Sequence, residues 1–205
     1  MKNKNASLIE QELKQKTVLH NDLKSYNRPV IIGAGPAGLF CALTLIENGV
    51  KPIIVEQGKT VEERQKDVEL FLKERMLNTC SNVQFGEGGA GTFSDGKLLT
   101  RISDPLCSFV LDTFVKFGAP QEIKYLAKPH VGTDLLRNVV KKMREEIVRL
   151  GGTVQFNSKL TGLTLDSASA VTSVKINSSF ELPTKAVFLC IGHSARDTFD
   201  VLVRN

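Results

Sequence analysis

The segment VIIGAGPAGL at residues 30–39 limits the fold of this chain more than any other part of the sequence. Val30 to Ile32 form a β-branched run, which is typical of a buried parallel strand. A turn with glycines at 33, 35 and 38 follows, and the apolar segment from Pro36 to Asn48 predicts a helix that Gly49 caps. A glycine-rich turn between a buried strand and a helix predicts a dinucleotide-binding α/β fold.

Each glycine of this turn has a predicted role. Gly33 permits the tight turn, Gly35 lets the backbone approach a pyrophosphate with no Cβ in the way, and Gly38 lets the helix pack closely on the strand. The free N–H groups and the partial positive charge of the helix N-terminus then favour binding of the phosphates. The alternative is a glycine turn without a ligand, but the strand, turn and helix in register favour the cofactor site.

A second buried strand is predicted from Pro52 to Glu56, and the acid at its carboxyl end completes the pattern. A carboxylate at this place can accept hydrogen bonds from both ribose hydroxyls of an adenosine, and it would repel the 2′-phosphate of NADP. The alternative is a solvated acid at the end of a strand.

The order of the remaining predicted elements indicates whether the fold is of the FAD-binding or the NAD-binding type. A capping-box pattern at Thr60 and Glu63 opens a helix to about Glu74. A further helix is predicted with Asp104 as its N-cap and Pro105 as its first residue, and Gly118 ends it. Another is predicted from a cap at Thr133 or Asp134 to Gly151. A third parallel strand is predicted at 153–156, antiparallel strands at about 160–165, 171–176 and 180–182, and a last buried strand at 186–191.

In a plain NAD-binding fold the third strand follows soon after the second. Here a long insertion separates them, and an antiparallel meander comes before the next parallel strand. We therefore predict an α/β, Rossmann-like FAD/NAD(P)-binding domain of the glutathione-reductase type, with a parallel sheet and an antiparallel β-meander. Residues 1–28 are predicted to form an N-terminal arm, and residues 29–205 the first part of the FAD-binding domain.

Two other segments are predicted to reach the cofactor. The loop VQFGEGGAGTFSDGK at residues 83–97 has five glycines, and we place it at the ribityl chain and the isoalloxazine ring. Its alternatives are a phosphate cradle, although the P-loop pattern is not met, and a mobile surface loop. The segment FLCIGHSARDT at residues 188–198 returns the chain to the cofactor after a strand. His193 either faces the flavin or is a turn histidine, and Arg196 either reaches a phosphate or pairs with Asp197 or Asp200.

The predicted cofactor contacts also include Arg64, which either touches the pyrophosphate or pairs with Glu62 or Asp67. We interpret His130 as structural, and Cys80 has no second cysteine at redox-pair spacing. The complete set of predicted contacts is Gly33, Gly35, Pro36, Ala37, Gly38, Glu56, Gln57, Arg64, Gly86, Gly88, Gly89, Ala90, Gly91, Thr92, Lys159, Leu160, Gly192 and His193.

Composition excludes several other functions. The net charge of +5 suits an anionic ligand, and the dispersed lysines do not favour nucleic acid. No two of the four cysteines have CxxC spacing, so we expect neither a metal site nor disulfides. Free cysteines are typical of a reducing compartment, and we therefore expect the protein to be cytoplasmic. The first 16 residues lack the apolar region of a signal peptide, and glycines and a proline interrupt the uncharged segment 29–46, so no membrane segment is expected.

Four segments in the same order, RPVIIGAGPAGLFCAL, SNVQFGEGGAGTFSDGKL, KPHVGTDLL and IGHSARDTF, resemble uncharacterised bacterial FAD-dependent dehydrogenases, also described as NAD(FAD)-utilising dehydrogenases. The resemblance runs from about Arg28 to the end. It implies FAD at Gly33, Gly35, Gly38, Glu56 and the 83–97 loop. It also implies a longer N-terminal domain and a substrate region beyond residue 205. We therefore expect the 205 residues alone to be inactive.

The predicted function is that of an FAD-dependent oxidoreductase with hydride transfer at the flavin N5. NAD(P)H is the candidate reductant, and the partner is a small-molecule substrate or electron acceptor. No catalytic acid or base is assigned. The alternatives are a non-catalytic FAD-binding protein and an NAD(P)-binding Rossmann protein.

Overall fold

The computed structural model describes residues 28–204, apart from positions 99, 101, 103 and 127. Almost all of the predicted arm, residues 1–27, therefore lies outside the described residues. Arg28, the last residue assigned to the arm, is bound to the folded domain. Its Nη2 donates to the Pro52 carbonyl and to the Thr153 hydroxyl, both at 2.8 Å.

A four-stranded parallel sheet lies at the centre of the domain. It consists of β1 (Val30–Ile32), β2 (Ile53–Val55), β3 (Thr153–Gln155) and β7 (Val187–Leu189), in the order β3-β2-β1-β7. All three neighbouring pairs are parallel and in regular register. The predicted parallel strands are confirmed. β1 has the predicted bounds, and β2, β3 and β7 are each shorter than the sequence pattern indicated.

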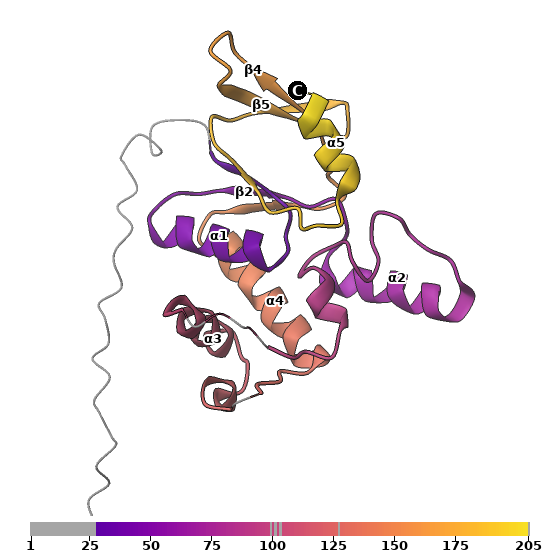
Figure 1. Ribbon diagram of the computed structural model, residues 1–205, viewed down its shortest axis with the longest axis vertical. Coiled ribbons are helices and arrows are strands. Elements are labelled where there is room, and N and C mark those ends of the chain that lie inside the picture. Colours follow the sequence, from indigo (N-terminus) through magenta and orange to yellow (C-terminus); the bar gives the residue numbers. More distant parts are fainter. Residues whose placement is uncertain (1–27, 99, 101, 103, 127, 205) are drawn as a thin grey trace, which may run out of the picture.

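Alternation along β1 and β2 divides the apolar core into two parts, because successive side chains of a strand point to opposite faces. Ile31 and Ile54 belong to a core shared with α1 (Pro36–Glu47) and α4 (Thr133–Arg149). Val30, Ile32 and their neighbours on β2 point to the other face. Figure 1 shows α1 and α4 together on one side of the sheet.

The other face is covered by a three-stranded antiparallel sheet, β4 (Leu160–Leu165), β5 (Val171–Ile176) and β6 (Phe180–Pro183). The second core joins the two sheets through Leu160, Val174 and Ile176, which are all buried. A last helix, α5 (Arg196–Arg204), lies beside β4 in Figure 1 and contacts it. The meander was predicted, whereas α5 was not.

The long insertion between β2 and β3 carries α2 (Val61–Glu74), α3 (Leu106–Lys116) and two short 3-10 helices, η2 (Ala90–Phe93) and η3 (Gln121–Lys124). The Thr60 hydroxyl accepts from the Glu63 amide at 3.3 Å, so the predicted cap of α2 is confirmed. At α3 the Asp104 carboxylate accepts from the Leu106 amide at 2.7 Å. The helix begins at Leu106 with Pro105 as its N-cap residue, so the predicted start was one residue too early.

The predicted cap of α4 and the predicted burial of the last strand were wrong. Neither Thr133 nor Asp134 caps α4, because the residue before the helix is Gly132, with φ +82°, and Asp134 pairs instead with Arg137. The last strand is not buried, because β7 stands at the edge of the sheet and Leu189 is 47% exposed. No helix in the described part of the chain is both long enough and apolar enough to span a bilayer.

Candidate cofactor site

A cavity of about 400 Å³ opens at the carboxyl ends of β1, β2 and β7. The chain proceeds from β1 to β2 and β3 on one side, and β7 adds on the other, so the cavity lies where the strand order reverses. This is the usual ligand position in open α/β sheets. The lining residues are Ile32, Gly33, Gly35–Ala37, Val55–Gln57, Gln84–Gly86, Gly89, Ala90, Ser158–Leu160, Leu189–Ala195 and Thr198.

The three glycines of the turn occupy different surroundings. Gly33 has φ +105°, and a Cβ there would lie 2.4 Å from the Cys190 carbonyl oxygen. A Cβ on Gly38 would lie 1.9 Å from the Gly33 carbonyl oxygen, so only glycine lets α1 approach the turn this closely. Gly35 differs, since a Cβ there would meet nothing within 4 Å and its φ of −71° suits any residue. Of the three glycines in this turn, Gly35 alone has room for a side chain, and it lines the cavity.

The N-terminus of α1 faces this cavity through Pro36 and Ala37. Gly35 is the N-cap residue and provides no side chain to cap the helix. The first N–H groups of a helix have no partner within it, and they carry a partial positive charge. Together they form a site for an anion, which is the predicted place of the pyrophosphate.

Glu56 has a second role that the sequence pattern did not indicate. Its side chain is buried, its Oε2 accepts from the Ala34 amide at 2.7 Å, and its Oε1 accepts from the Gly58 amide at 2.8 Å. The carboxylate therefore holds the glycine turn against the end of β2. Each carboxylate oxygen can accept more than one hydrogen bond, and Glu56 lines the cavity, so it can still accept from a ribose.

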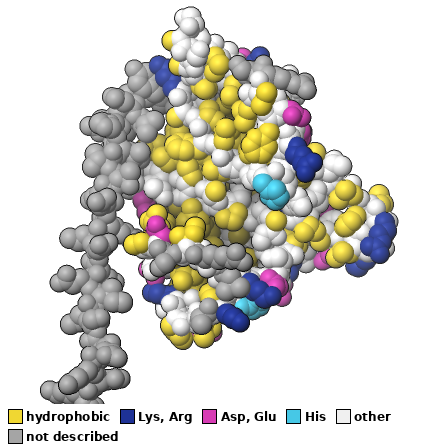
Figure 2. All heavy atoms as spheres, viewed as in Figure 1, with side chains coloured by type: hydrophobic (Ala, Val, Ile, Leu, Met, Phe, Trp, Pro, Cys, Tyr) yellow, Lys and Arg dark blue, Asp and Glu magenta, His cyan; other side chains and the backbone are white. Residues whose placement is uncertain are grey.

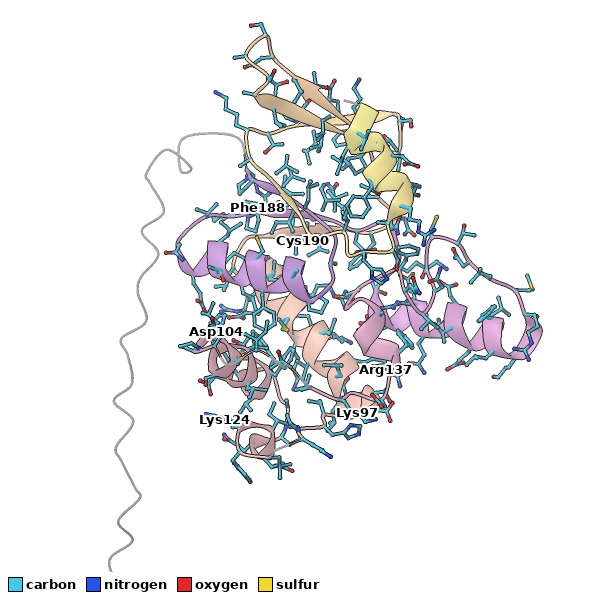
Figure 3. The ribbon with its side chains drawn as sticks, viewed as in Figure 1. Lys97, Asp104, Lys124, Arg137, Phe188 and Cys190 are labelled. Carbon is cyan, nitrogen blue, oxygen red and sulfur yellow. The ribbon has the colours of Figure 1, made fainter. Side chains whose placement is uncertain are left out.

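The glycine-rich loop divides between two hollows. Of the predicted contacts in this loop, Gly86, Gly89 and Ala90 line the main cavity, next to Gln84 and Phe85. Gly88, Gly91 and Thr92 instead line a second hollow of about 120 Å³, which has apolar walls from α1, α3 and α4 and shares Pro36 with the main cavity. The Thr92 hydroxyl there is buried and has no hydrogen-bond partner. Figure 3 shows that Lys97, at the end of the loop, and Arg137 lie near the start of α4, away from Cys190.

Arg64 does not occupy the predicted position at the pyrophosphate. Its side chain is fully buried, and its Nε, Nη1 and Nη2 each donate at 2.7 Å to a carbonyl of the glycine-rich loop segment. Those carbonyls belong to Asn82, Glu87 and Val83 respectively. The predicted alternatives, Glu62 and Asp67, are bound by other cations, Arg144 and Lys59.

The other predicted contacts lie on the cavity wall. Gln57, Lys159 and Leu160 stand at the β2 and β4 side, and Gly192 and His193 follow β7. His193 is exposed, with its Nε2 3.4 Å from the Ser194 hydroxyl. Lys159 pairs with Asp197, and this hydrogen bond lowers the pKa of the Asp197 carboxyl. His130 lies elsewhere, where it forms an isolated antiparallel bridge with Lys97.

A pair of thiols at the cavity was not foreseen. Cys190 lines the cavity and Cys41 lies on α1, and the two contribute to the same core. A hydrogen bond between the thiols lowers the pKa of Cys190 to about 7 and raises the pKa of Cys41. In Figure 3 Cys190 lies just beyond β7, near α1. The residues are far apart in sequence, so no spacing pattern could have indicated the pair.

Figure 2 shows cationic and anionic side chains dispersed over the visible face, with apolar side chains between them. Within the described residues, no group of three or more His, Cys, Asp or Glu side chains is placed to hold a metal ion.

Comparisons with known proteins agree with this geometry. Residues 27–201 match the family model described as pyridine nucleotide-disulphide oxidoreductase. An uncharacterised protein of Clostridium beijerinckii is 57% identical over 177 residues, which cover 86% of this chain and 33% of that protein. The chain therefore spans about a third of the length of this relative.

Two solved structures show the same fold at low sequence identity. The crystal structure of Thermovibrio ammonificans THI4 aligns with a TM-score of 0.56 and 17% identity, covering 90% of this chain and 65% of that one. The open conformation of a flavocytochrome c3 fumarate reductase aligns with a TM-score of 0.50 and 14% identity, covering 80% and 33%.

Proposed function

Because the chain belongs to the pyridine nucleotide-disulphide oxidoreductase family, we propose that it binds FAD in the main cavity and that the whole protein is a flavin-dependent oxidoreductase. Its substrate or electron acceptor is a small molecule. NAD(P)H is the proposed reductant, and the cytoplasm the proposed location, which the four free cysteines support.

The observation that carries the proposal is the position of Gly35. It lies at the N-terminus of α1, it lines the cavity, and it leaves open the space that a Cβ would fill. The Glu56 carboxylate lines the same cavity from the end of β2. An anion site and an acceptor for hydroxyl groups thus face one hollow, as the pyrophosphate and ribose of a dinucleotide require.

FAD is favoured over NAD by the walls that the insertion and the meander add. Gln84–Gly86, Gly89 and Ala90 come from the insertion between β2 and β3, and Ser158–Leu160 lead into the antiparallel sheet. These segments add walls to the cavity beyond those that the glycine turn and the parallel strands provide. Their places support an extended ligand with adenosine toward Lys159 and Leu160, and the flavin end toward Gly89 and Ala90.

When bound, the flavin would supply the hydride chemistry at its N5. The residues of this chain bind and orient it: the α1 N-terminus holds the phosphates and Glu56 accepts from the ribose. The backbone at Gly89 and Ala90 lets a flat ring approach. Glu56 also disfavours NADP at this site, because a 2′-phosphate would meet a buried carboxylate.

Titration calorimetry of the full-length apoprotein with FAD, NAD⁺ and NADP⁺ tests the choice of cofactor. We expect stoichiometric FAD binding that is at least about a hundredfold tighter than binding of either nicotinamide nucleotide at this site, a difference of about 2.7 kcal/mol. The loaded protein should bleach with NADH and reoxidise with an electron acceptor. Tighter binding of NAD⁺ than of FAD would contradict the proposal, and a flavin that only dithionite reduces would indicate a non-catalytic flavoprotein.

A further inference from the structure

We propose that Arg64 is the positioning residue of the cofactor site: its buried guanidinium holds the loop segment 82–87 in the shape that forms the cavity wall, without touching the cofactor. This inference rests on the proposed function, because it concerns the loop that the flavin is proposed to contact.

Within the described residues, the side-chain hydrogen bonds of Arg64 go to carbonyls of residues 82–87 and not to its own helix. Three short bonds go to the carbonyls of residues 82, 83 and 87, and a longer contact of 3.5 Å goes to the carbonyl of Gly86. A guanidinium is a rigid planar fork of five donors, so it can fix several carbonyls in one geometry at once. Loss of this side chain would therefore free the loop rather than α2.

The loop shows the matching features. Gly86 has φ +115°, and a Cβ there would lie 2.6 Å from Arg64 Cδ, so the loop can rest on the arginine stem only because residue 86 is glycine. The Phe93 ring covers the guanidinium, with 4.6 Å between Arg64 Cζ and the ring centroid. Gln84, Phe85 and Gly86 line the cavity, so the arginine supports the wall from behind.

A buried cation needs compensation, and the surroundings of Arg64 provide it. Burial lowers the pKa of Arg64 to about 10, while the Glu56 and Glu87 carboxylates act in the opposite direction. The side chain therefore stays cationic at neutral pH. Glu56 is the proposed ribose ligand, so one electrostatic cluster joins the ribose site to the loop.

Glu87 fastens the same loop to two helices. Its buried side chain accepts from the Val61 amide at 2.8 Å through Oε2. Its Oε1 lies 2.8 Å from Arg144 Nε on α4, an ion pair in which the N–H is not aligned with the oxygen. Arg144 also pairs with Glu62 at the start of α2. Contacts within the protein thus hold the wall segment to both α2 and α4.

The test compares Arg64→Met and Arg64→Lys with Arg137→Met in the full-length protein. Arg137 is the matched control, because its guanidinium also lies over Phe93, at 5.5 Å, but binds none of the loop carbonyls in residues 82–87. FAD affinity is measured by calorimetry, and hydrogen exchange of the 82–90 amides is measured in the apoprotein. Arg64→Lys preserves the charge without the fork and serves if Arg64→Met does not fold.

We expect both Arg64 variants to exchange faster in residues 82–90, and to bind FAD at least about tenfold more weakly, which corresponds to 1.4 kcal/mol. Ethylguanidine, but not ethylammonium, should restore part of the affinity of Arg64→Ala, which leaves the space of the arginine stem open, because only the planar fork fits the carbonyls. Arg137→Met should match the wild type. If the wild type binds FAD and an Arg64 variant binds it equally, with unchanged exchange in the loop, the positioning role is wrong. If the wild type itself does not bind FAD, the proposed function fails instead.

Discussion

Replacing Gly35 should separate cofactor binding from stability. The backbone at Gly35, with φ −71° and ψ −178°, accepts any residue, and a Cβ would meet nothing within 4 Å. Gly35→Val should therefore change the unfolding free energy by no more than about 1 kcal/mol, mainly through the N-cap position. For a domain of this size that is a shift of about 2–4 °C in Tm.

The effect on the cofactor should be far larger. The valine methyl groups would occupy the hollow in which the phosphate oxygens are proposed to lie, so FAD should bind at least about a hundredfold more weakly. Gly38→Ala should show the reverse order of effects, because its Cβ would lie 1.9 Å from the Gly33 carbonyl oxygen. Forcing these backbones apart should cost about 1–3 kcal/mol of stability or more.

The assay measures Tm by circular dichroism and FAD affinity by calorimetry for both variants and for Gly35→Ser. Serine is a favoured N-cap residue, so Gly35→Ser should keep or raise Tm while FAD binding falls. A Gly35→Val protein that unfolds like Gly38→Ala would refute the reasoning from open space. One that binds FAD as tightly as the wild type would refute the pyrophosphate site.

Three further predictions follow from named side chains. Glu56→Gln should weaken FAD binding by about tenfold or more in calorimetry, because charge-assisted bonds are lost and one backbone N–H is left facing an amide NH₂. The control Glu63→Gln, at an exposed glutamate, should leave FAD binding unchanged. Iodoacetamide should alkylate Cys190 with a rate that rises through about pH 7, and bound FAD should slow the reaction. Peptide mass spectrometry measures the rate; a rate that rises only near the usual pKa of a thiol, or one that FAD does not slow, would contradict the prediction. Burial raises the pKa of Glu87 from 4.5 to about 7, so the folded state holds this proton more tightly than the unfolded state. The contribution of this proton to the free energy of unfolding is fully present below about pH 4.5 and is lost as the pH rises through 7. Urea titrations should find Glu87→Gln close to the wild type at pH 4.5 but more stable by up to about 3 kcal/mol at pH 8, and parallel pH profiles would count against the shift.

The parts of the site that were predicted correctly depend on local sequence. The roles of Gly33 and Gly38 follow from a strand, a turn and a helix that are contiguous, and Glu56 ends the next strand. The Thr60 cap is local in the same way, since it involves a residue three positions away. Such patterns restrict the backbone directly, so they can be interpreted without the rest of the fold.

The parts that were missed depend on segments that meet only in three dimensions. Arg64 binds carbonyls about 20 positions away because an irregular loop folds back onto α2, and helical spacing cannot indicate that. The division of the glycine-rich loop between two hollows depends likewise on α3 and α4. For α5 a signal existed, since Phe199, Leu202 and Val203 have helical spacing, but no element was predicted beyond residue 198.

The small molecule that the protein retains on purification tests the proposed cofactor most directly. The full-length protein should be yellow, with the absorbance bands of oxidised flavin, and acid release should yield FAD as shown by mass spectrometry, at about one molecule per chain. Gly35→Val, purified in the same way, should be folded and colourless. Release of NAD⁺ in place of FAD, or a folded wild-type protein that stays colourless even after incubation with excess FAD, would contradict the proposed cofactor site.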